Sequence, residues 1–310
     1  MKEKKVIFIG TPVFAVPVLQ ALIENANVIA VVSQPNKEVG RKKVVVDTPI
    51  ATIAKDNNIL LMQPVKIKEI TNEIKKLNPD MIVTCAYGQI IPEDILNIPE
   101  YGCINVHGSL LPKLRGGAPI QRAIINGEEK TGITIMYMDK GMDTGDMISK
   151  KEIEIEEEDN EETLSNKMSS LGAKLLIDTL PSIFDGTNKR ESQDDTLATF
   201  APIIKKEDEL LDFNKTSREV YNQIRGLSPV PGAYFIMDNK RIKVYNSYIG
   251  EGKGKKPSTI SNIYKDGFAI ATIDSEIVIT ELQVEGKKRM DGKSYLNGLN
   301  KDNMLNKRIN

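Results

Sequence analysis

A short run in the middle of the chain carries an amide and an imidazole at the spacing of a strand. The run is Cys103-Ile104-Asn105-Val106-His107-Gly108-Ser109-Leu110-Leu111-Pro112, and His107 is the only histidine in 310 residues. Because side chains alternate along a strand, Asn105 and His107 point to one face and Ile104 and Val106 to the other. An amide can stabilise an oxyanion and an imidazole can accept a proton. A lone histidine beside a core strand is also a common structural residue, so the run predicts a site only together with its neighbours.

A second polar loop, Met138-Asp139-Lys140-Gly141-Met142-Asp143-Thr144-Gly145-Asp146, offers three carboxylates. They could simply form turns, and their spacing is not that of a calcium loop. One of them could instead orient His107 and raise its basicity. An Asn, His, Asp set of this kind suits acyl transfer to an external nucleophile. Neither a G-x-S-x-G elbow nor a plausible Cys, His dyad is apparent, so a covalent acyl-enzyme is not indicated.

Several other classes of protein are disfavoured. Gly10-Thr11-Pro12 lacks the G-x-G-x-x-G of a dinucleotide site, although a helix N-terminus there could hold an anion or be an ordinary turn. No stretch approaches the roughly 18 to 20 apolar residues of a membrane helix. Cys85 and Cys103 are the only cysteines, and both lie in apolar runs. We therefore expect reduced core thiols, no metal and a cytoplasmic location.

The elements that position these residues alternate between apolar runs and amphipathic stretches, which predicts an α/β fold with a doubly wound, mostly parallel, Rossmann-like sheet. The expected strands are 6–9, 28–32, 81–86, 103–106, 133–137 and 153–155, and the expected helices begin near Pro12 or span 47–57, 66–77 and 160–180. Ligands bind at the carboxyl ends of such strands. We expect the segments after residues 86, 107 and 137 to leave the sheet at one edge and to converge.

The remainder of the chain has a different pattern. Residues 184–209 are polar and show neither the alternation of a strand nor the periodicity of a helix. This pattern predicts a linker between a larger domain at 1–183, which holds the candidate catalytic residues, and a smaller domain at 210–310. The smaller domain shows one helix at 217–227, then short strands at 233–237, 241–248, 268–273 and 276–284. Short strands without intervening helices predict a small β-barrel or a sandwich.

Charge is polarised along the chain, although the net charge is −1. Before Lys205 there are 23 basic and 29 acidic residues, and from Lys205 onward there are 19 and 14. A basic C-terminal part suits a polyanionic partner, although charge alone fits a solvated surface equally well.

Four motifs closely resemble the methionyl-tRNA formyltransferases, and the resemblance covers essentially the whole chain. They are Phe8-Ile9-Gly10-Thr11-Pro12, Ala86-Tyr87-Gly88-Gln89-Ile90-Ile91-Pro92, Asn105 to Gly116, and Met142-Asp143-Thr144-Gly145-Asp146, with Arg225-Gly226-Leu227-Ser228-Pro229 in the second domain. Leu114 replaces an aromatic residue often seen between Lys113 and Arg115 in this family.

The resemblance implies transfer of a formyl group from 10-formyltetrahydrofolate to the α-amine of methionine on initiator tRNA. Asn105 would stabilise the oxyanion, His107 would take the amine proton, and Asp143 would orient and polarise His107. The formyl-tetrahydrofolate pocket would be formed, with the Asp143 loop, by Tyr87, Gly88, Gln89, Ile90, Ile91, Pro92, Ser109, Leu110, Leu111 and Pro112.

The acceptor needs further evidence, because other formyltransferases of this type act on nucleotide sugars or a purine precursor, and some hydrolyse formyl-folate. By resemblance, the basic segment 34–49 would insert into the acceptor stem of tRNA, with Arg41, Lys42 and Lys43 in contact and Arg41 foremost. The resemblance also implies that the basic second domain is a barrel of the oligonucleotide-binding (OB) type, which would contact the tRNA backbone. A sugar acceptor and a non-catalytic RNA-binding protein remain the alternatives. We expect a monomer that does not associate with membranes.

Overall fold

A computed structural model describes residues 1–40, 43–297, 299–300 and 303–309. The chain forms two compact units. Unit 1 comprises residues 1–119, 130–154 and 165–202, and unit 2 comprises 120–129, 155–164 and the chain from Ile203 onward. Two short segments that precede Ile203 in the chain therefore belong to unit 2.

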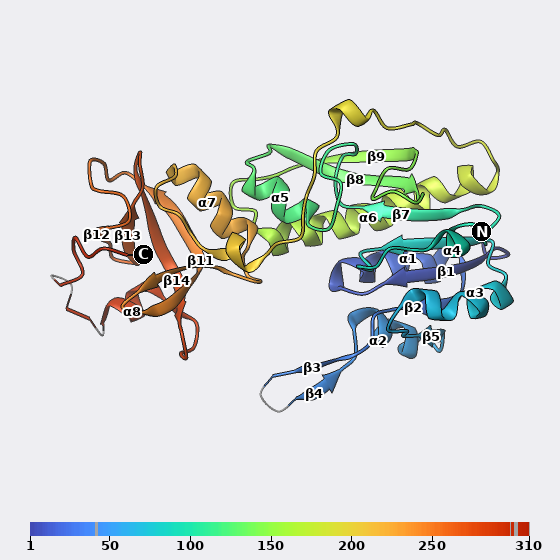
Figure 1. The fold of residues 1–310 in the computed structure, drawn as a ribbon, viewed down its shortest axis with the longest axis horizontal. Coiled ribbons are helices and arrows are strands. Elements are labelled where there is room, and N and C mark those ends of the chain that lie inside the picture. Colours follow the sequence, from blue (N-terminus) through green and yellow to red (C-terminus); the bar gives the residue numbers. More distant parts are fainter. Residues whose placement is uncertain (41–42, 298, 301–302, 310) are drawn as a thin grey trace. The chain divides into compact units, whose positions relative to one another are not determined.

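A seven-stranded sheet forms the centre of unit 1 (Figure 1), in the order β5-β2-β1-β6-β7-β8-β9. The strands are β1 Lys5–Gly10, β2 Asn27–Val32, β5 Leu60–Met62, β6 Met81–Cys85, β7 Cys103–His107, β8 Lys130–Tyr137 and β9 Met147–Glu154. From β5 to β7 all neighbours are parallel, whereas β8 is antiparallel to β7, and β9 to β8. The mostly parallel α/β sheet expected from the sequence is confirmed.

The direction of β8 overturns one expectation. Tyr137, at the end of β8, pairs with Ile104 near the start of β7, and the Met138 amide donates to the Cys103 carbonyl at 2.8 Å. Segment 138–146 therefore leaves the sheet at the edge opposite to the segments that follow β6 and β7. The prediction of one common edge was wrong because it assumed that every strand runs parallel.

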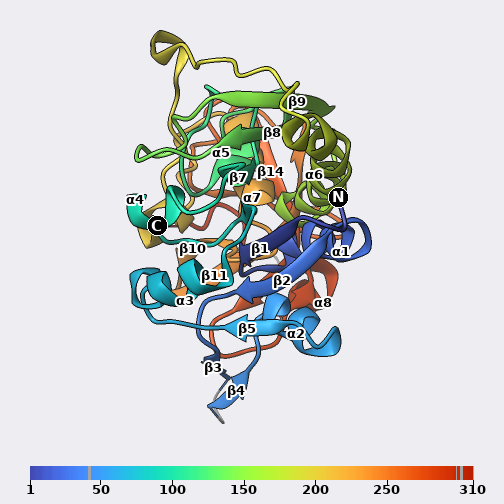
Figure 2. The same ribbon diagram turned by 90° about the vertical axis from the view of Figure 1, so that its right-hand side faces the viewer.

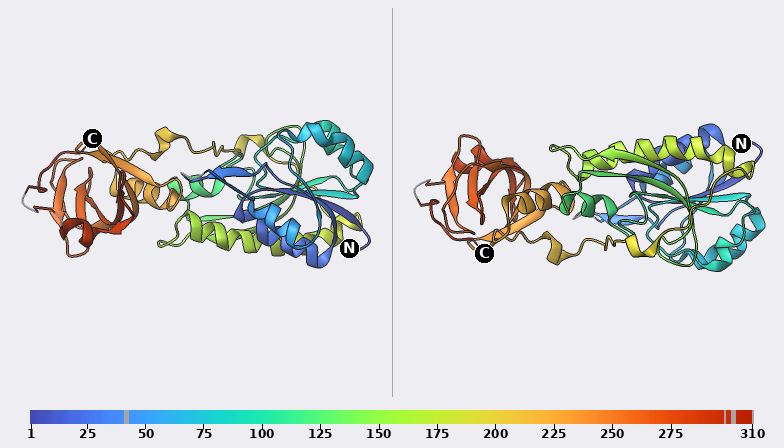
Figure 3. Two further views of the ribbon diagram at one scale, coloured as in Figure 1. Left: turned by 90° about the horizontal axis from the view of Figure 1, so that it is seen from below. Right: turned by 90° about the horizontal axis from the view of Figure 1, so that it is seen from above.

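Helices cover both faces of this sheet (Figure 3). The helices of the chain are α1 Val16–Asn25, α2 Pro49–Asp56, α3 Thr71–Leu77, α4 Glu93–Leu96, α5 Pro119–Ile125, α6 Glu161–Phe184, α7 Ser217–Gly226 and α8 Gly292–Asn297, with 3-10 turns at Val13–Ala15, Ile67–Ile70, Asp195–Leu197 and Lys206–Glu209. Helices α1 and α6 lie on one face and α3 on the other. A Cβ on Gly172 of α6 would be 3.0 Å from Val106, so α6 packs closely on β7. Ile74 of α3 and Ile95 of α4 join a buried cluster with Ile7 and Ile82.

A two-stranded hairpin extends from unit 1 within the predicted basic loop (Figure 2). Strand β3, Lys37–Val39, pairs with β4, Val44–Val46, and Val45 is 63% exposed. The loop prediction missed this pairing, although three consecutive β-branched residues favour a strand.

Residues 186–202, expected to be a linker, pack against the sheet of unit 1. Glu191 forms an antiparallel bridge with Met147 of β9, and Phe200 forms a parallel bridge with Arg115. These are isolated pairings between segments far apart in the sequence. Isolated pairings produce no periodic pattern in the sequence, and the segment therefore resembles a linker.

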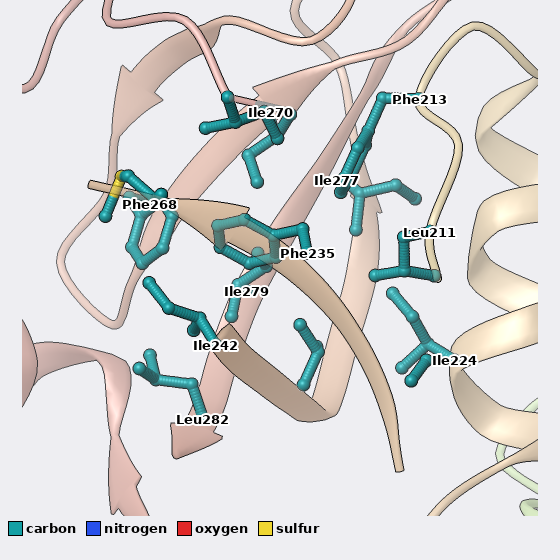
Figure 4. Close-up of a cluster of buried hydrophobic side chains, with 14 of the residues drawn as sticks. Leu211, Phe213, Ile224, Phe235, Ile242, Phe268, Ile270, Ile277, Ile279 and Leu282 are labelled. Carbon is teal, nitrogen blue, oxygen red and sulfur yellow. The ribbon is translucent and has the colours of Figure 1, made fainter. Parts of the chain in front are cut away.

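Unit 2 is built on an antiparallel sheet in the order β10-β11-β14-β13-β12, with β15 on β14. Its strands are β10 Ala233–Met237, β11 Lys240–Gly250, β12 Ile260–Ile263, β13 Phe268–Ala271, β14 Glu276–Val284 and β15 Met290–Asp291. Phe235, Phe268 and Ile279 are fully buried in one core (Figure 4). The antiparallel second domain is confirmed, and its closure as a barrel remains a prediction.

Candidate active site

Strand β7 presents Asn105 on the same face as Thr84 of the neighbouring strand. The two residues are register partners in the parallel β6-β7 ladder, and the Thr84 hydroxyl donates to Asn105 Oδ1 at 2.9 Å. This bond directs the amide oxygen of Asn105 towards the protein. Among the described residues no hydrogen bond is made by Asn105 Nδ2, so the amide NH₂ is available to a ligand. An NH₂ group held in this way can stabilise a developing oxyanion.

The His107 ring is 5% exposed and is held by the loop that follows its own strand. Its Nε2 lies 3.1 Å from the Leu114 carbonyl oxygen. Because a carbonyl oxygen only accepts, the proton of neutral His107 belongs on Nε2, and Nδ1 carries the lone pair. Nδ1 lies 3.7 Å from Asp143 Oδ2, which is close enough for charge interaction but too long for a hydrogen bond. Leu114, which sequence analysis noted only as a departure from the family pattern, thus sets the tautomer through its backbone.

Asp143 lies at the tip of segment 138–146, which turns back along the sheet face to reach His107. The Gly116 amide donates to Asp143 Oδ2 at 2.8 Å. Asp143 itself has φ +55°, a conformation that asparagine and aspartate tolerate better than most residues. The three predicted catalytic residues are therefore brought to one face of the sheet, with His107 next to Asp143 and Asn105 two residues away on β7.

The predicted donor loop after β6 is divided between core and solvent. Tyr87 and Ile91 are buried, whereas Ile90 is 86% exposed and Gly88, at φ +84°, is exposed. Burial raises the pKa of Tyr87 to about 12, and its hydroxyl is without a hydrogen-bond partner in the described part of the chain. Gln89 accepts from the Ile67 amide at 3.0 Å, which ties the loop to the turn before α3. Pro92 is partly buried and immediately precedes α4.

The second predicted donor segment, residues 109–112, is anchored mainly through Thr134 of β8. The Thr134 hydroxyl donates to the Ser109 carbonyl at 2.7 Å, and the Leu111 amide donates to the same hydroxyl at 3.1 Å. Ser109 and Leu111 are consequently buried, while Leu110 and Pro112 remain partly exposed. The segment follows β7 at the edge where the Tyr87 loop follows β6, so both parts of the predicted pocket adjoin His107.

Comparisons with known proteins agree with this geometry. A formyl transferase family model matches residues 4–180, and a model of the formyl transferase C-terminal domain matches 203–300. Methionyl-tRNA formyltransferase of Staphylococcus epidermidis is 51% identical over 95% of this chain and 96% of its own length. The Bacillus subtilis enzyme is 49% identical over 95% and 94%.

The chain belongs to the methionyl-tRNA formyltransferases. It is therefore a formyl-transferring enzyme, and the function expected from its sequence, formylation of methionyl initiator tRNA in translation initiation, is the one that this family carries out. A solved sugar 3N-formyl transferase, determined in the presence of dTDP and 5-N-formyl-THF, shares the fold with a TM-score of 0.65, at 23% identity over 92% of this chain and 99% of that one.

Of the residues predicted to bind tRNA in this methionyl-tRNA formyltransferase, Lys43 directly precedes β4 of the hairpin. Arg41 and Lys42 fall outside the described residues. Lys43 is exposed, with its Nζ 3.7 Å from the Glu38 carboxylate, and this exposed pair contributes little to stability. The role of Arg41, Lys42 and Lys43 in tRNA binding therefore remains a prediction.

A separate hollow of about 700 Å³ opens in unit 1 near the start of β7 and the end of β8. Tyr101, Cys103, Met138 and Arg190 are among its lining residues, and none of the predicted site residues lines it. In the described part of the chain, no helix is long and apolar enough to cross a membrane.

Three supporting residues were missed by the sequence analysis of this formyltransferase. Thr84 orients Asn105, the Leu114 carbonyl holds His107, and the Gly116 amide holds Asp143. Only Gly116 left a signal in the sequence, because two consecutive glycines, Gly116 and Gly117, stand at the end of the central motif. Gly116 has φ +122°, and a Cβ at this position would lie 2.8 Å from the Ala201 carbonyl oxygen, which explains why glycine is required there.

Proposed function

We propose that this enzyme transfers the formyl group of 10-formyltetrahydrofolate to the α-amine of methionine on initiator tRNA, with Asn105, His107 and Asp143 as the catalytic residues. The observation that carries the proposal is that one sheet face holds the Asn105 amide, whose oxygen is bound by Thr84, and an imidazole lone pair beside a carboxylate. This is an arrangement for acyl transfer to an external amine.

The chemical steps follow from these positions. The amine lone pair attacks the formyl carbon, and the Asn105 Nδ2 group donates to the resulting oxyanion. His107 Nδ1 accepts the proton that the amine loses, and the Asp143 carboxylate stabilises the imidazolium by charge. The carbon to N10 bond then breaks, and a proton from His107 passes to the departing nitrogen. We assign no step to a metal ion.

Two observations support a folate as the formyl donor. The chain belongs to a formyltransferase family, and a solved relative of the same fold was determined with 5-N-formyl-THF. We place the donor against the predicted pocket residues that keep exposed surface, which are Gly88, Gln89, Ile90, Pro92, Leu110 and Pro112.

The acceptor side of the proposal rests on family membership and on charge. The β3-β4 hairpin, with Arg41, Lys42 and Lys43, would contact the acceptor stem, and the basic second domain would contact phosphates. We propose that the enzyme is cytoplasmic and acts as a monomer, since a subunit that holds a bulky tRNA needs no second copy. Free, buried Cys85 and Cys103 suit a reducing compartment.

The decisive experiment supplies 10-formyltetrahydrofolate labelled in its formyl carbon to three parallel acceptors: methionyl initiator tRNA, the same tRNA uncharged, and a nucleotide-sugar amine. We expect label in formylmethionine from the charged tRNA alone. Label on the sugar would overturn the acceptor, and release of formate in all three reactions would make the protein a hydrolase.

A further inference from the structure

The segment that was predicted to be a linker makes the bonds that hold both members of the His107, Asp143 pair. We call residues 190–201 the strap. Gln193 Nε2 donates to the carbonyl oxygens of Asp143 and Gly145, each at 2.8 Å. One side-chain amide thereby fixes the backbone on both sides of Thr144. The strap also holds the end of the Asp143 loop, because Arg190 and Ser192 both donate to the Asp146 carboxylate, each at 3.1 Å.

The orientation of the Gln193 amide is itself determined by its partners. Its Oε1 accepts from the buried Arg115 guanidinium, with Nε at 3.0 Å. Arg115 donates only, and the two carbonyls accept only, so the amide cannot be flipped without losing all three bonds. Arg115 also donates to Asp195 at 2.8 Å, which ties the guanidinium to the next turn of the strap.

The other end of the strap reaches His107 through Leu114. The Leu114 amide donates to the Thr199 hydroxyl at 2.9 Å, and its carbonyl accepts from His107 Nε2. Two further backbone bonds join the strap to Arg115, at 2.9 Å from the Arg115 amide to the Thr199 carbonyl and 2.7 Å from the Ala201 amide to the Arg115 carbonyl. Leu114 has φ +58°, an uncommon conformation for leucine that these bonds help to maintain.

We propose that Gln193 is a positioning residue for formyl transfer: it acts through Asp143, and the strap keeps Asp143 and His107 within working distance of each other. The inference rests on the proposed roles of these two residues. Because Gln193 contacts the backbone of the Asp143 loop rather than the reacting atoms, its contribution is to the rate of the bound complex and not to substrate binding.

Two substitutions separate positioning from folding. Gln193→Ala removes all three bonds. Gln193→Glu keeps the length of the side chain and gains charge attraction to Arg115, but sets a carboxylate oxygen against two carbonyl oxygens. Asp194→Ala is the matched control, because the bonds of that side chain stay within the strap, on Thr196.

Steady-state kinetics on methionyl-tRNA give the first readout. We expect kcat to fall about tenfold in Gln193→Ala and in Gln193→Glu, with KM for the folate within about twofold and with Asp194→Ala near wild type. A rise in KM with kcat unchanged would overturn positioning in favour of a binding role. Wild-type kcat in the Gln193→Glu protein would overturn it as well.

A double-mutant comparison gives the second readout. If Gln193 acts through Asp143, adding Gln193→Ala to Asp143→Asn lowers kcat by less than about twofold further. A full additional tenfold loss would show that Gln193 acts independently of Asp143. An inactive wild-type enzyme would instead refute the proposed function, so the two failures are distinguishable. Melting temperatures of all variants identify any loss caused by unfolding.

Discussion

The Nε2 of His107 donates a hydrogen bond to the carbonyl of Leu114, and this leaves the Nδ1 lone pair facing Asp143 at 3.7 Å. The backbone, rather than the carboxylate, therefore selects the tautomer. In the proposed mechanism, Asp143 therefore stabilises the imidazolium by charge once His107 has accepted a proton, and it does not hold the ring through a hydrogen bond.

Replacing His107 by asparagine is expected to abolish transfer while leaving the fold and tRNA affinity intact. The reason is that asparagine is polar, like histidine, but its amide cannot accept the amine proton. General-base catalysis is typically worth about 100-fold or more. Formyl transfer and tRNA binding should be measured on one preparation. A residual rate within about tenfold of wild type would exclude His107 as the base.

Replacing Thr84 by valine is expected to lower kcat by roughly 5- to 20-fold with little effect on melting temperature. Valine has the same shape in this buried position, but it leaves Asn105 Oδ1 without its donor, so the amide loses its preferred orientation. Single-turnover rates at saturating folate measure the effect. Thr131→Val is the matched control, because Thr131 is also buried and its hydroxyl has no partner among the described residues. Equal losses in both variants would contradict the orienting role.

Replacing Gly116 by alanine is expected to reduce activity at least tenfold, because the new Cβ would lie 2.8 Å from the Ala201 carbonyl and displace the amide that holds Asp143. Gly186→Ala is the comparison variant, since Gly186 also has positive φ, at +68°, but nothing lies within 4 Å of its Cβ. Gly186→Ala should lose about 1 kcal/mol of stability from backbone strain, and Gly116→Ala should lose more because the contact with Ala201 adds to the strain. Only Gly116→Ala should lose activity, and unchanged transfer in that variant would refute this view of the loop.

The stability of unit 2 should depend on pH through Glu161. Burial, and then the nearby Glu162 carboxylate, raise the pKa of Glu161 to about 7 from an ordinary value of 4.5. Because the folded-state pKa is the higher one, the stabilising contribution is complete below about 4.5 and is lost as pH rises through 7. Glu161→Gln should therefore add roughly 1 kcal/mol to the free energy of unfolding at pH 8, after discounting for partial exposure, and nothing at pH 4.5.

Urea unfolding at the two pH values measures this difference. Glu158→Gln is the control, since Glu158 is an exposed carboxylate close to the same helix start. A stabilisation of Glu161→Gln that is equal at both pH values would show that the effect does not come from ionisation.

Much of this protein was predictable from residue order. The apolar runs before Gly10, Ala86 and Gly108 mark buried parallel strands, and alternation along 103–107 assigns Asn105 and His107 to one face. The capping box that begins α7 at Thr216 is likewise a local signal. Such features are visible because period and capping depend only on near neighbours in the chain.

The tertiary structure decided the rest. The direction of β8 is set by its antiparallel pairing with β7. Because of this direction, segment 138–146 must turn back to bring Asp143 to His107. Gln193 and Thr199 lie about 50 and 85 residues from the groups they bind, separations that no local pattern encodes. Residue order alone was enough to propose the side chains for formyl transfer and to assign Asn105 and His107 to one face of a strand. Only the packed structure shows the tautomer of His107, the orientation of Asn105 and the hydrogen-bond partners of Asp143. These depend on hydrogen bonds between distant segments, which form only after folding has brought those segments together.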